Sequence, residues 1–266
     1  MMHLLIGIIS SAAVAITAYR KHALSAGGSV AAVVVGTVLV TTAHPFWFAL
    51  MLVFFVTSSA WSRYKRKLKR QVAQQFAKGE RRDALQVMAN GGAAVLFACM
   101  YIQWNDPVWV WAFTGSLASV TADTWATEIG VLSSARPRSV LNGRKVDTGE
   151  SGGVTLAGTL AAAAGAALIA VCGYVLSPLD DVAMPPRWHY IFAGTAAGLI
   201  GAFVDSLLGA TVQRQCVCHV CQKTVESLSH CGRKASPVRG VSWMTNDAVN
   251  AIASFSGGVA CIFLMG

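Results

Sequence analysis

Acidic side chains lie inside several apolar stretches of this chain, where charge is costly and usually serves a function. Asp123 and Glu128 lie in one stretch, Asp205 in a second, and Asp247 at the start of a third. Carboxylates gathered in a dry site repel one another unless a cation lies among them. Mg²⁺ prefers oxygen ligands and usually binds one or two carboxylates together with substrate phosphates. We therefore predict a catalytic magnesium site on Asp123, Asp205 and Asp247.

Two other uses of these acids remain open. They could pair with arginines of adjoining loops and hold helices together, or they could carry protons in a transporter. Pairing accounts for one or two buried acids, but poorly for acids that three stretches bring to one depth. A proton pathway would continue to the opposite face, whereas the other halves of these stretches are nearly all apolar.

A glycine-rich loop precedes a further apolar stretch, and it reads Thr148-Gly149-Glu150-Ser151-Gly152-Gly153. Glycines before a helix let backbone amides close on an anion, and the helix N-terminus adds a favourable partial charge. The spacing is not that of a Walker loop, and many such loops are only turns and caps. We predict phosphate or nucleotide binding here by Thr148, Gly149, Ser151, Gly152 and Gly153, with Lys145 as a catalytic point charge.

Polar residues at the same ends of other stretches extend this predicted phosphate and nucleotide site. They are Arg20, Lys21, Asn90, Glu128, Asn246 and Asn250.

A separate cluster of cysteines and histidines has metal-ligand spacing. Cys218 and Cys221 are followed by the pair His230-Cys231, which is typical of tetrahedral zinc sites. We predict structural zinc on Cys218, Cys221, Cys231 and either His230 or Cys216. Reduced surface thiols are the alternative, and a cytosolic location disfavours a disulfide.

The composition places these residues in a membrane protein. Of the 266 residues 55% are hydrophobic and 12% are charged, with a mean hydropathy of +0.54, whereas soluble domains carry about 25% charged residues. Disordered chains, coiled coils and most soluble enzymes are thereby excluded. We expect one integral membrane domain over 1–266, an all-α polytopic bundle of about eight spans: 2–18, 28–43, 45–61, 87–103, 108–131, 152–176, 189–211 and 246–265.

A proline lies at the boundary between the second and third of these stretches. His44-Pro45 separates them, and proline lacks the amide hydrogen that a continuous helix needs. We favour two full spans, with a re-entrant pair as the alternative.

The distribution of cations predicts the orientation. Nearly all of the 21 Lys and Arg residues fall in alternate loops that share one side, which the positive-inside rule assigns to the cytosol. We expect 62–86 to form an amphipathic helix there, a solvated charge run being the alternative, and 212–245 to form the Cys/His loop. The net charge of +9 then reflects orientation and anionic lipid or phosphorylated substrates. No nucleic-acid recognition module accompanies it.

Several separated motifs resemble those of the polytopic family that contains transmembrane protein 19 and plant phytyl-phosphate kinase. The resemblance covers nearly the whole chain and departs from the family at Glu150, where a small or hydroxyl residue is usual. The motifs lie at 19–25, 86–90, 119–130, 148–155, 205–213, 218–232 and 246–250.

The resemblance implies an isoprenoid-monophosphate kinase that uses Mg²⁺ and a nucleoside triphosphate, CTP or ATP, to make the diphosphate. Arg20 and Lys21 would then hold the acceptor phosphate. Cytidylyl transfer to a lipid phosphate and lipid or ion transport are the alternatives. The expected partners are an isoprenoid lipid phosphate, a nucleotide and membrane lipid; a homodimer stays open. Because no transit peptide precedes the first stretch, we expect a prokaryotic cytoplasmic membrane with the site facing the cytosol.

Overall fold

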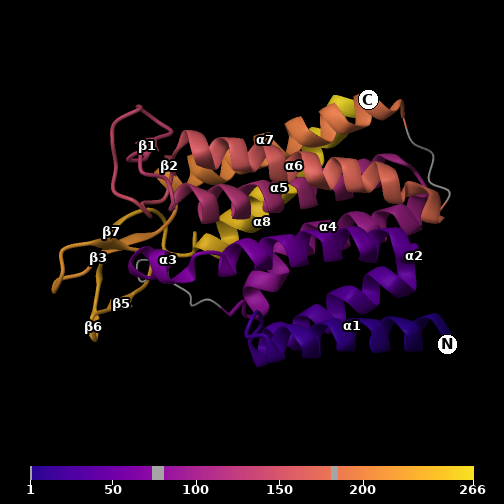
Figure 1. Ribbon diagram of the computed structural model, residues 1–266, viewed down its shortest axis with the longest axis horizontal. Coiled ribbons are helices and arrows are strands. Elements are labelled where there is room, and N and C mark those ends of the chain that lie inside the picture. The colour runs from indigo at the N-terminus through magenta and orange to yellow at the C-terminus, as the bar shows by residue number, and fades with distance from the viewer. Residues whose placement is uncertain (1, 74–80, 181–184) are drawn as a thin grey trace.

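The computed structural model describes residues 2–73, 81–180 and 185–266 and shows a helical membrane bundle, as predicted (Figure 1). Its helices are α1 (Met2–Arg20), α2 (Ala26–Arg63), α3 (Arg66–Ala73), α4 (Ala84–Trp104), α5 (Val108–Gly130), α6 (Leu156–Leu176), the short 3₁₀ helix η1 (Ser177–Asp180), α7 (Arg187–Thr211) and α8 (Asn246–Met265). Its strands are β1 (Arg138–Ser139), β2 (Gly153–Val154), β3 (Gln215–Val217), β4 (Thr224–Val225), β5 (Ser229–His230), β6 (Arg233–Lys234) and β7 (Ser236–Arg239). All strand pairs are antiparallel, β1 with β2, β3 with both β4 and β7, and β5 with β6.

The expected number of eight spans is not confirmed. Within the described residues, five stretches are long and apolar enough to cross a membrane: Pro45–Arg63, Ala84–Trp104, Leu156–Leu179, Arg187–Thr211 and Asn246–Met265. Leu4–Arg20 and Ala26–Thr41 are apolar but shorter. Helix α5 has 23 residues, but its serines, threonines and acids lower its hydropathy. Since α4, α6, α7 and α8 all pack against α5, its buried serines and threonines, such as Ser116, Ser119 and Thr121, meet other helices rather than lipid.

Helix α2 folds back on itself near Pro45. A Cβ added to Gly36 would lie 3.0 Å from Cε2 of Phe48, although a straight helix would separate residues this far apart by about 18 Å. Figure 1 shows two arms of α2 meeting at a sharp bend. The predicted break at His44-Pro45 therefore appears as a change of direction within one helix, caused by the amide hydrogen that Pro45 lacks.

Small residues let the central helices approach closely. Cβ atoms added to Gly257 of α8 or Gly201 of α7 would collide with Ser119 of α5. The Ser119 hydroxyl donates to the carbonyl oxygen of Ala253 at 3.0 Å, so this part of the polar stripe on α5 joins helices. The close packing brings the C-terminal ends of α5 and α7 beside the N-terminal end of α8.

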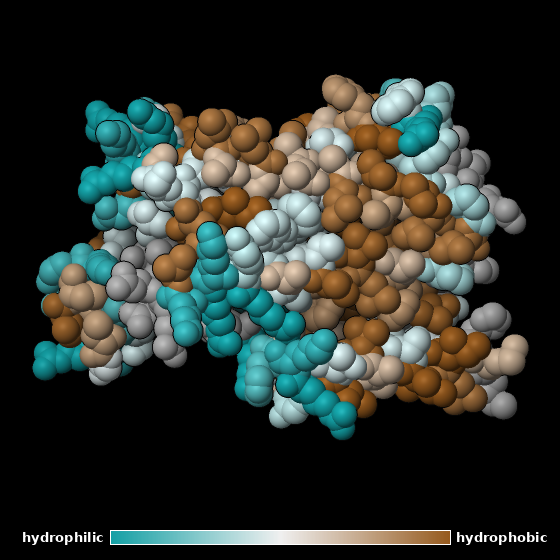
Figure 2. All heavy atoms as spheres, in the orientation of Figure 1, coloured by the Kyte–Doolittle hydropathy of each residue, from teal (hydrophilic) through white to brown (hydrophobic). Residues whose placement is uncertain are grey.

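Loops and short elements gather at one end of the bundle, which we call the polar end: residues 21–25, 64–73, 81–83, 131–155 and 212–245. Both chain termini lie at the other end (Figure 1). Hydrophilic residues concentrate at the polar end and apolar residues over the helices (Figure 2). The amphipathic helix expected over 62–86 is described only as α3, Arg66–Ala73, and residues 74–80 of that prediction lie outside the described residues.

Candidate functional site

A cavity of about 960 Å³ opens at the polar end, and Asp123, Asp205 and Asp247 all line it. Each aspartate comes from a different helix: α5, α7 and the first turn of α8. Thr245 caps α8 and accepts a hydrogen bond from the amide of Ala248 at 3.4 Å, which fixes the start of that helix beside the cavity. The structure thus brings the three predicted metal ligands to one site.

Acidic side chains are concentrated in this cavity. In their ionised forms Asp123 and Asp205 repel each other electrostatically, and Glu226 repels both. Oδ2 of Asp205 is buried, and no hydrogen-bond partner reaches it among the residues that the structure describes. A cation satisfies such an oxygen and reduces the repulsion, so the donor set fits a divalent ion with oxygen ligands.

Most of the other predicted site residues also line this cavity, namely Lys21, Asn90, Glu128, Thr148, Gly149, Ser151, Gly152, Gly153, Asn246 and Asn250. Arg20 and Lys145 are not among the lining residues and have exposed side chains. Lys145 forms a backbone bridge with Arg138 in the irregular turn beside β1. The structure therefore does not bring Lys145, predicted to be catalytic, to the aspartates.

The glycine-rich loop is shaped largely by its contact with α7. Gly152 has a φ of +82°, and a Cβ there would collide with Ala210. The Ser151 hydroxyl donates to Oε1 of Glu226 at 3.0 Å. Packing thus explains why glycine stands at position 152, and Ser151 binds a carboxylate within the protein.

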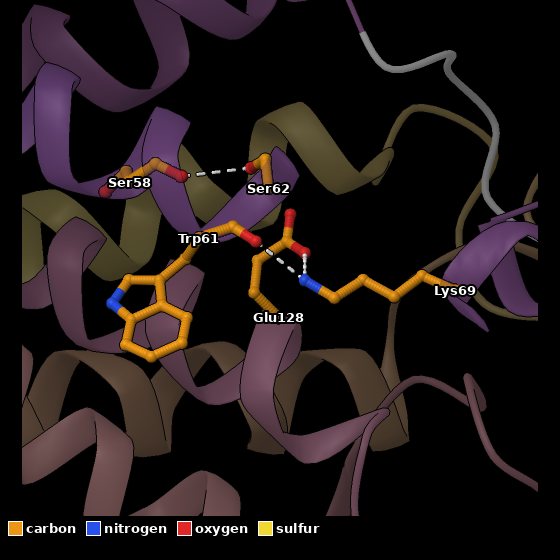
Figure 3. Close-up of polar contacts among 5 residues, drawn as sticks. All are labelled: Ser58, Trp61, Ser62, Lys69 and Glu128. Carbon is orange, nitrogen blue, oxygen red and sulfur yellow. Dashed lines mark hydrogen bonds and ion pairs between the residues drawn. The ribbon is translucent and has the colours of Figure 1, made fainter. Parts of the chain in front are cut away.

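Glu128 forms an ion pair that the sequence did not indicate. Nζ of Lys69 lies 2.6 Å from Oε2 of Glu128 and donates to the Trp61 carbonyl oxygen at 2.7 Å (Figure 3). The side chains of Lys69 and Glu128 are 8% and 22% exposed. Glu128, predicted to bind phosphate or nucleotide, links α5 to α3 and to the end of α2 through this contact.

Arg82 is a further cavity residue that sequence reasoning missed. Its guanidinium lies over the rings of Phe54 and Phe55, at 5.5 and 5.6 Å. Burial lowers its pKa to about 10, opposed by the negative charge of Glu128, so it remains a cation at neutral pH. Nη1 is buried without a hydrogen-bond partner in the described part of the chain. Its position beside the Asp83 cap of α4 is the signal that could have identified it.

An apolar crevice of about 70 Å³ lies beside the polar cavity. Residues of α1, both arms of α2 and α4 line it, including Val14, Phe48 and Val87. Three residues line both spaces: Arg82, Gln86 and Asn90. The charged cavity therefore borders an apolar crevice, with Arg82 at the boundary.

Glu226 reaches the cavity from the Cys/His loop. It is 9% exposed, and its Oε1 accepts hydrogen bonds from Nε2 of Gln213 at 2.8 Å and from Ser151. Nothing in its local sequence marks it as a site residue; only its place between Cys221 and His230 hints at a fixed position. Those two residues, with Cys218 and Cys231, form one compact cluster.

Comparisons with known proteins identify the family. A model described as integral membrane protein DUF92 matches residues 9–258. Protein PGR of Arabidopsis thaliana is 32% identical over 98% of this chain and 97% of its own length. The uncharacterized membrane protein MJ0933 of Methanocaldococcus jannaschii is 30% identical over 81% and 85%. The uncharacterized membrane protein sll0875 of Synechocystis is 24% identical over 81% and 72%.

No solved structure matches the chain. The names of these relatives specify no kinase activity, so the resemblance is established at the level of an integral membrane family. Both the match over nearly the whole chain and the identity to Protein PGR lead to the same assignment. The chain belongs to the DUF92 family of integral membrane proteins.

Proposed function

We propose that this protein is an isoprenoid-monophosphate kinase. A terminal oxygen of the lipid phosphate attacks the γ-phosphorus of a nucleoside triphosphate, and the bond from that phosphorus to the β-γ bridging oxygen breaks. The products are an isoprenoid diphosphate and the nucleoside diphosphate. An acceptor phosphate that is already ionised needs little help from a general base, so positioning and charge neutralisation supply most of the catalysis.

The observation that carries this proposal is the junction of two unlike spaces at Arg82. An isoprenoid phosphate has an apolar tail and a dianionic head, and the apolar crevice and the polar cavity have the corresponding characters. A guanidinium can bind phosphate oxygens through a fork of donors. We assign the acceptor phosphate to Arg82 and Lys21, and the carbons next to that phosphate to the crevice, whose volume of about 70 Å³ is too small for a whole isoprenoid chain. The nucleotide is assigned to the rest of the cavity, whose volume lies within the range of ligand sites.

The carboxylates complete the proposed arrangement. Asp123, Asp205 and Asp247 would hold Mg²⁺, which when bound neutralises phosphate charge. Lys21 and Arg214 add positive charge to the cavity wall, which helps retain a polyphosphate against the acids. The glycine-rich loop from Thr148 to Gly153 closes one side.

Orientation follows from the charge distribution. The polar end holds most of the cations, so we place it at the cytosolic face of the membrane, where nucleotides are present. The expectation of a prokaryotic cytoplasmic membrane belongs to this proposal.

The lining of the cavity disfavours the transport alternative. Among the described residues, no α5 residue before Asp123 and no α8 residue after Asn250 lines it. Beyond them α5 and α8 are packed closely, and Phe113 contacts Trp47 with ring centroids 4.6 Å apart. A closed outer half suits an enzyme that binds substrates from one side.

Product analysis by mass spectrometry tests the proposal. Purified protein would receive phytyl, geranylgeranyl or farnesyl phosphate with ATP or CTP and Mg²⁺. We expect an isoprenyl diphosphate that forms only with nucleotide and Mg²⁺. A lipid product that contains cytidine would instead establish cytidylyl transfer. No turnover with any pair, together with lipid or ion flux in proteoliposomes without nucleotide, would support transport.

A further inference from the structure

The Cys/His cluster has the dimensions of a tetrahedral zinc site. Zinc–sulfur bonds of about 2.3 Å and zinc–nitrogen bonds of about 2.05 Å place tetrahedral ligands about 3.6 Å apart for sulfur and nitrogen. Nδ1 of His230 lies 3.5 Å from Sγ of Cys221 and 3.3 Å from Sγ of Cys231. With Cys218, all four ligand atoms lie within 4.8 Å of one another.

The backbone around the cluster supports a thiolate metal centre. The amide of Val220 donates to Sγ of Cys218 at 3.4 Å, and the Gln222 amide donates to the Cys218 carbonyl oxygen at 2.9 Å. Gln222 and Cys231 adopt left-handed conformations, with φ of +58° and +50°, which turn the chain tightly around the cluster. A hydrogen-bonded thiolate is a better metal ligand than a free thiol.

The cluster also decides between the two fourth ligands that the sequence left open. Cys216 is fully buried and packs with Val225 and Ala235 as the small core of the loop. His230 supplies a ring nitrogen within the cluster. A ligand set of three cysteines and one histidine leaves no open position, which is typical of structural zinc.

Besides the pairing of its short strands, the loop has only a small apolar core. Cys216, Val225 and Ala235 are the residues of its own buried apolar cluster among those described, and units with so small a core usually need a metal or disulfides. Glu226 lies between ligands on both sides, Cys221 and His230. Whatever fixes the ligands therefore also fixes the segment that carries Glu226 to Ser151 and Gln213.

We propose that Cys218, Cys221, His230 and Cys231 bind one structural Zn²⁺, and that this zinc holds Glu226 in the cavity wall. The ion cross-links the loop between α7 and α8. Glu226 of this loop then contacts the glycine-rich loop through Ser151. The zinc site thereby sets the shape of the cavity without contacting a substrate, and this role does not depend on the reaction that the cavity performs.

Metal analysis of the full-length protein, purified in detergent without added chelator, tests the site. We expect about one zinc ion per chain in the wild type and a loss of at least about tenfold in Cys221→Ser. Cys99→Ser, on α4 away from the cluster, is the matched control and keeps its zinc. Co²⁺ exchanged into the wild type should show the absorption of tetrahedral thiolate coordination. Wild type without zinc, or Cys221→Ser with its full content, would overturn the proposal.

Hydrogen exchange tests the link to Glu226. Cys221→Ser should raise amide exchange both in the loop and at 148–153, and Glu226→Gln should raise it at 148–153 while the zinc content stays at the wild-type level. Both readouts are independent of activity, so they hold if the kinase proposal fails. Unchanged exchange at 148–153 after zinc loss would refute the coupling between zinc and the cavity wall.

Discussion

Asp205 and Arg82 are half-buried ionisable residues at the polar end, and each has a buried atom without a hydrogen-bond partner in the described part of the chain. Burying a charge without full compensation costs several kcal/mol, so both residues are suited to ligands of opposite charge. Asp205 lies in the cavity with Asp123, and Arg82 lies at its border with the apolar crevice. The two residues thus have complementary preferences, for a cation and for a phosphate.

Replacing Arg82 tests its proposed contact with the lipid phosphate. Arg82→Ala should raise KM for the isoprenyl phosphate about 10- to 100-fold, since a charge-assisted phosphate contact is lost, and leave KM for the nucleotide nearly unchanged. Arg82→Lys should recover part of the loss. Arg144→Ala, an exposed arginine outside the cavity, is the control. Equal effects of Arg82→Ala on both KM values would contradict the assignment.

Lys145→Ala should weaken transfer less than Arg82→Ala does.

The ion pair between Lys69 and Glu128 should show energetic coupling. Lys69→Met removes the ammonium that contacts a largely buried carboxylate, which costs about 3 kcal/mol of unfolding free energy. Glu128→Gln should also destabilise the protein, whereas the double variant should unfold closer to the wild type than Lys69→Met does. Thermal unfolding in detergent gives the comparison. Strictly additive losses would show that the two side chains do not stabilise each other.

The glycine-rich loop can approach α7 closely because Gly152 has no Cβ atom. Gly152 and Gly143 both have positive φ, but only Gly152 approaches another element, because nothing lies within 4 Å of a Cβ at Gly143. Gly152→Ala should cost about 3 kcal/mol through strain and collision, and Gly143→Ala about 1 kcal/mol through strain alone. Unfolding temperatures of the two variants provide the measurement. Equal shifts would mean that the loop does not depend on its contact with α7.

Depth within helices was predictable from the sequence, and the direction of loop side chains was not. Asp123, Asp205 and Asp247 could be placed together because helix length and orientation fix how deep a residue lies. Lys145 and Glu226 depend on short strands and turns whose pairing no local pattern specifies. Spacing alone therefore assigned a catalytic role to Lys145, which is exposed, and gave none to Glu226, which is buried in the site.

At the scale of the whole molecule, both termini lie opposite the polar end (Figure 1). A reporter that is active only in the cytosol should therefore be inactive when fused to either terminus, and active when inserted in the exposed stretch 141–144 of the loop between α5 and α6. The cation distribution predicts this orientation. Opposite locations for the two termini would contradict the fold, and two active terminal fusions would invert the orientation.

Hydropathy alone predicts the long apolar stretches but not the total number of membrane spans. It located all five of the long apolar stretches that the structure confirms, because burial in lipid demands an unbroken apolar run. It could not tell how far α1 and the first arm of α2 extend across the bilayer, since packing against neighbouring helices sets that depth. Nor does hydropathy identify α5 as a span, because its buried serines and threonines, which face other helices, lower the value.

Binding of Mn²⁺, a paramagnetic substitute for Mg²⁺, tests the aspartate site most directly. Electron paramagnetic resonance of the purified protein with a non-hydrolysable nucleoside triphosphate should show about one tightly bound ion per chain. Asp205→Asn should weaken that binding at least about tenfold. Asp106→Asn, an exposed aspartate outside the cavity, should bind as the wild type does. Wild-type affinity in Asp205→Asn would show that the three carboxylates do not hold the metal.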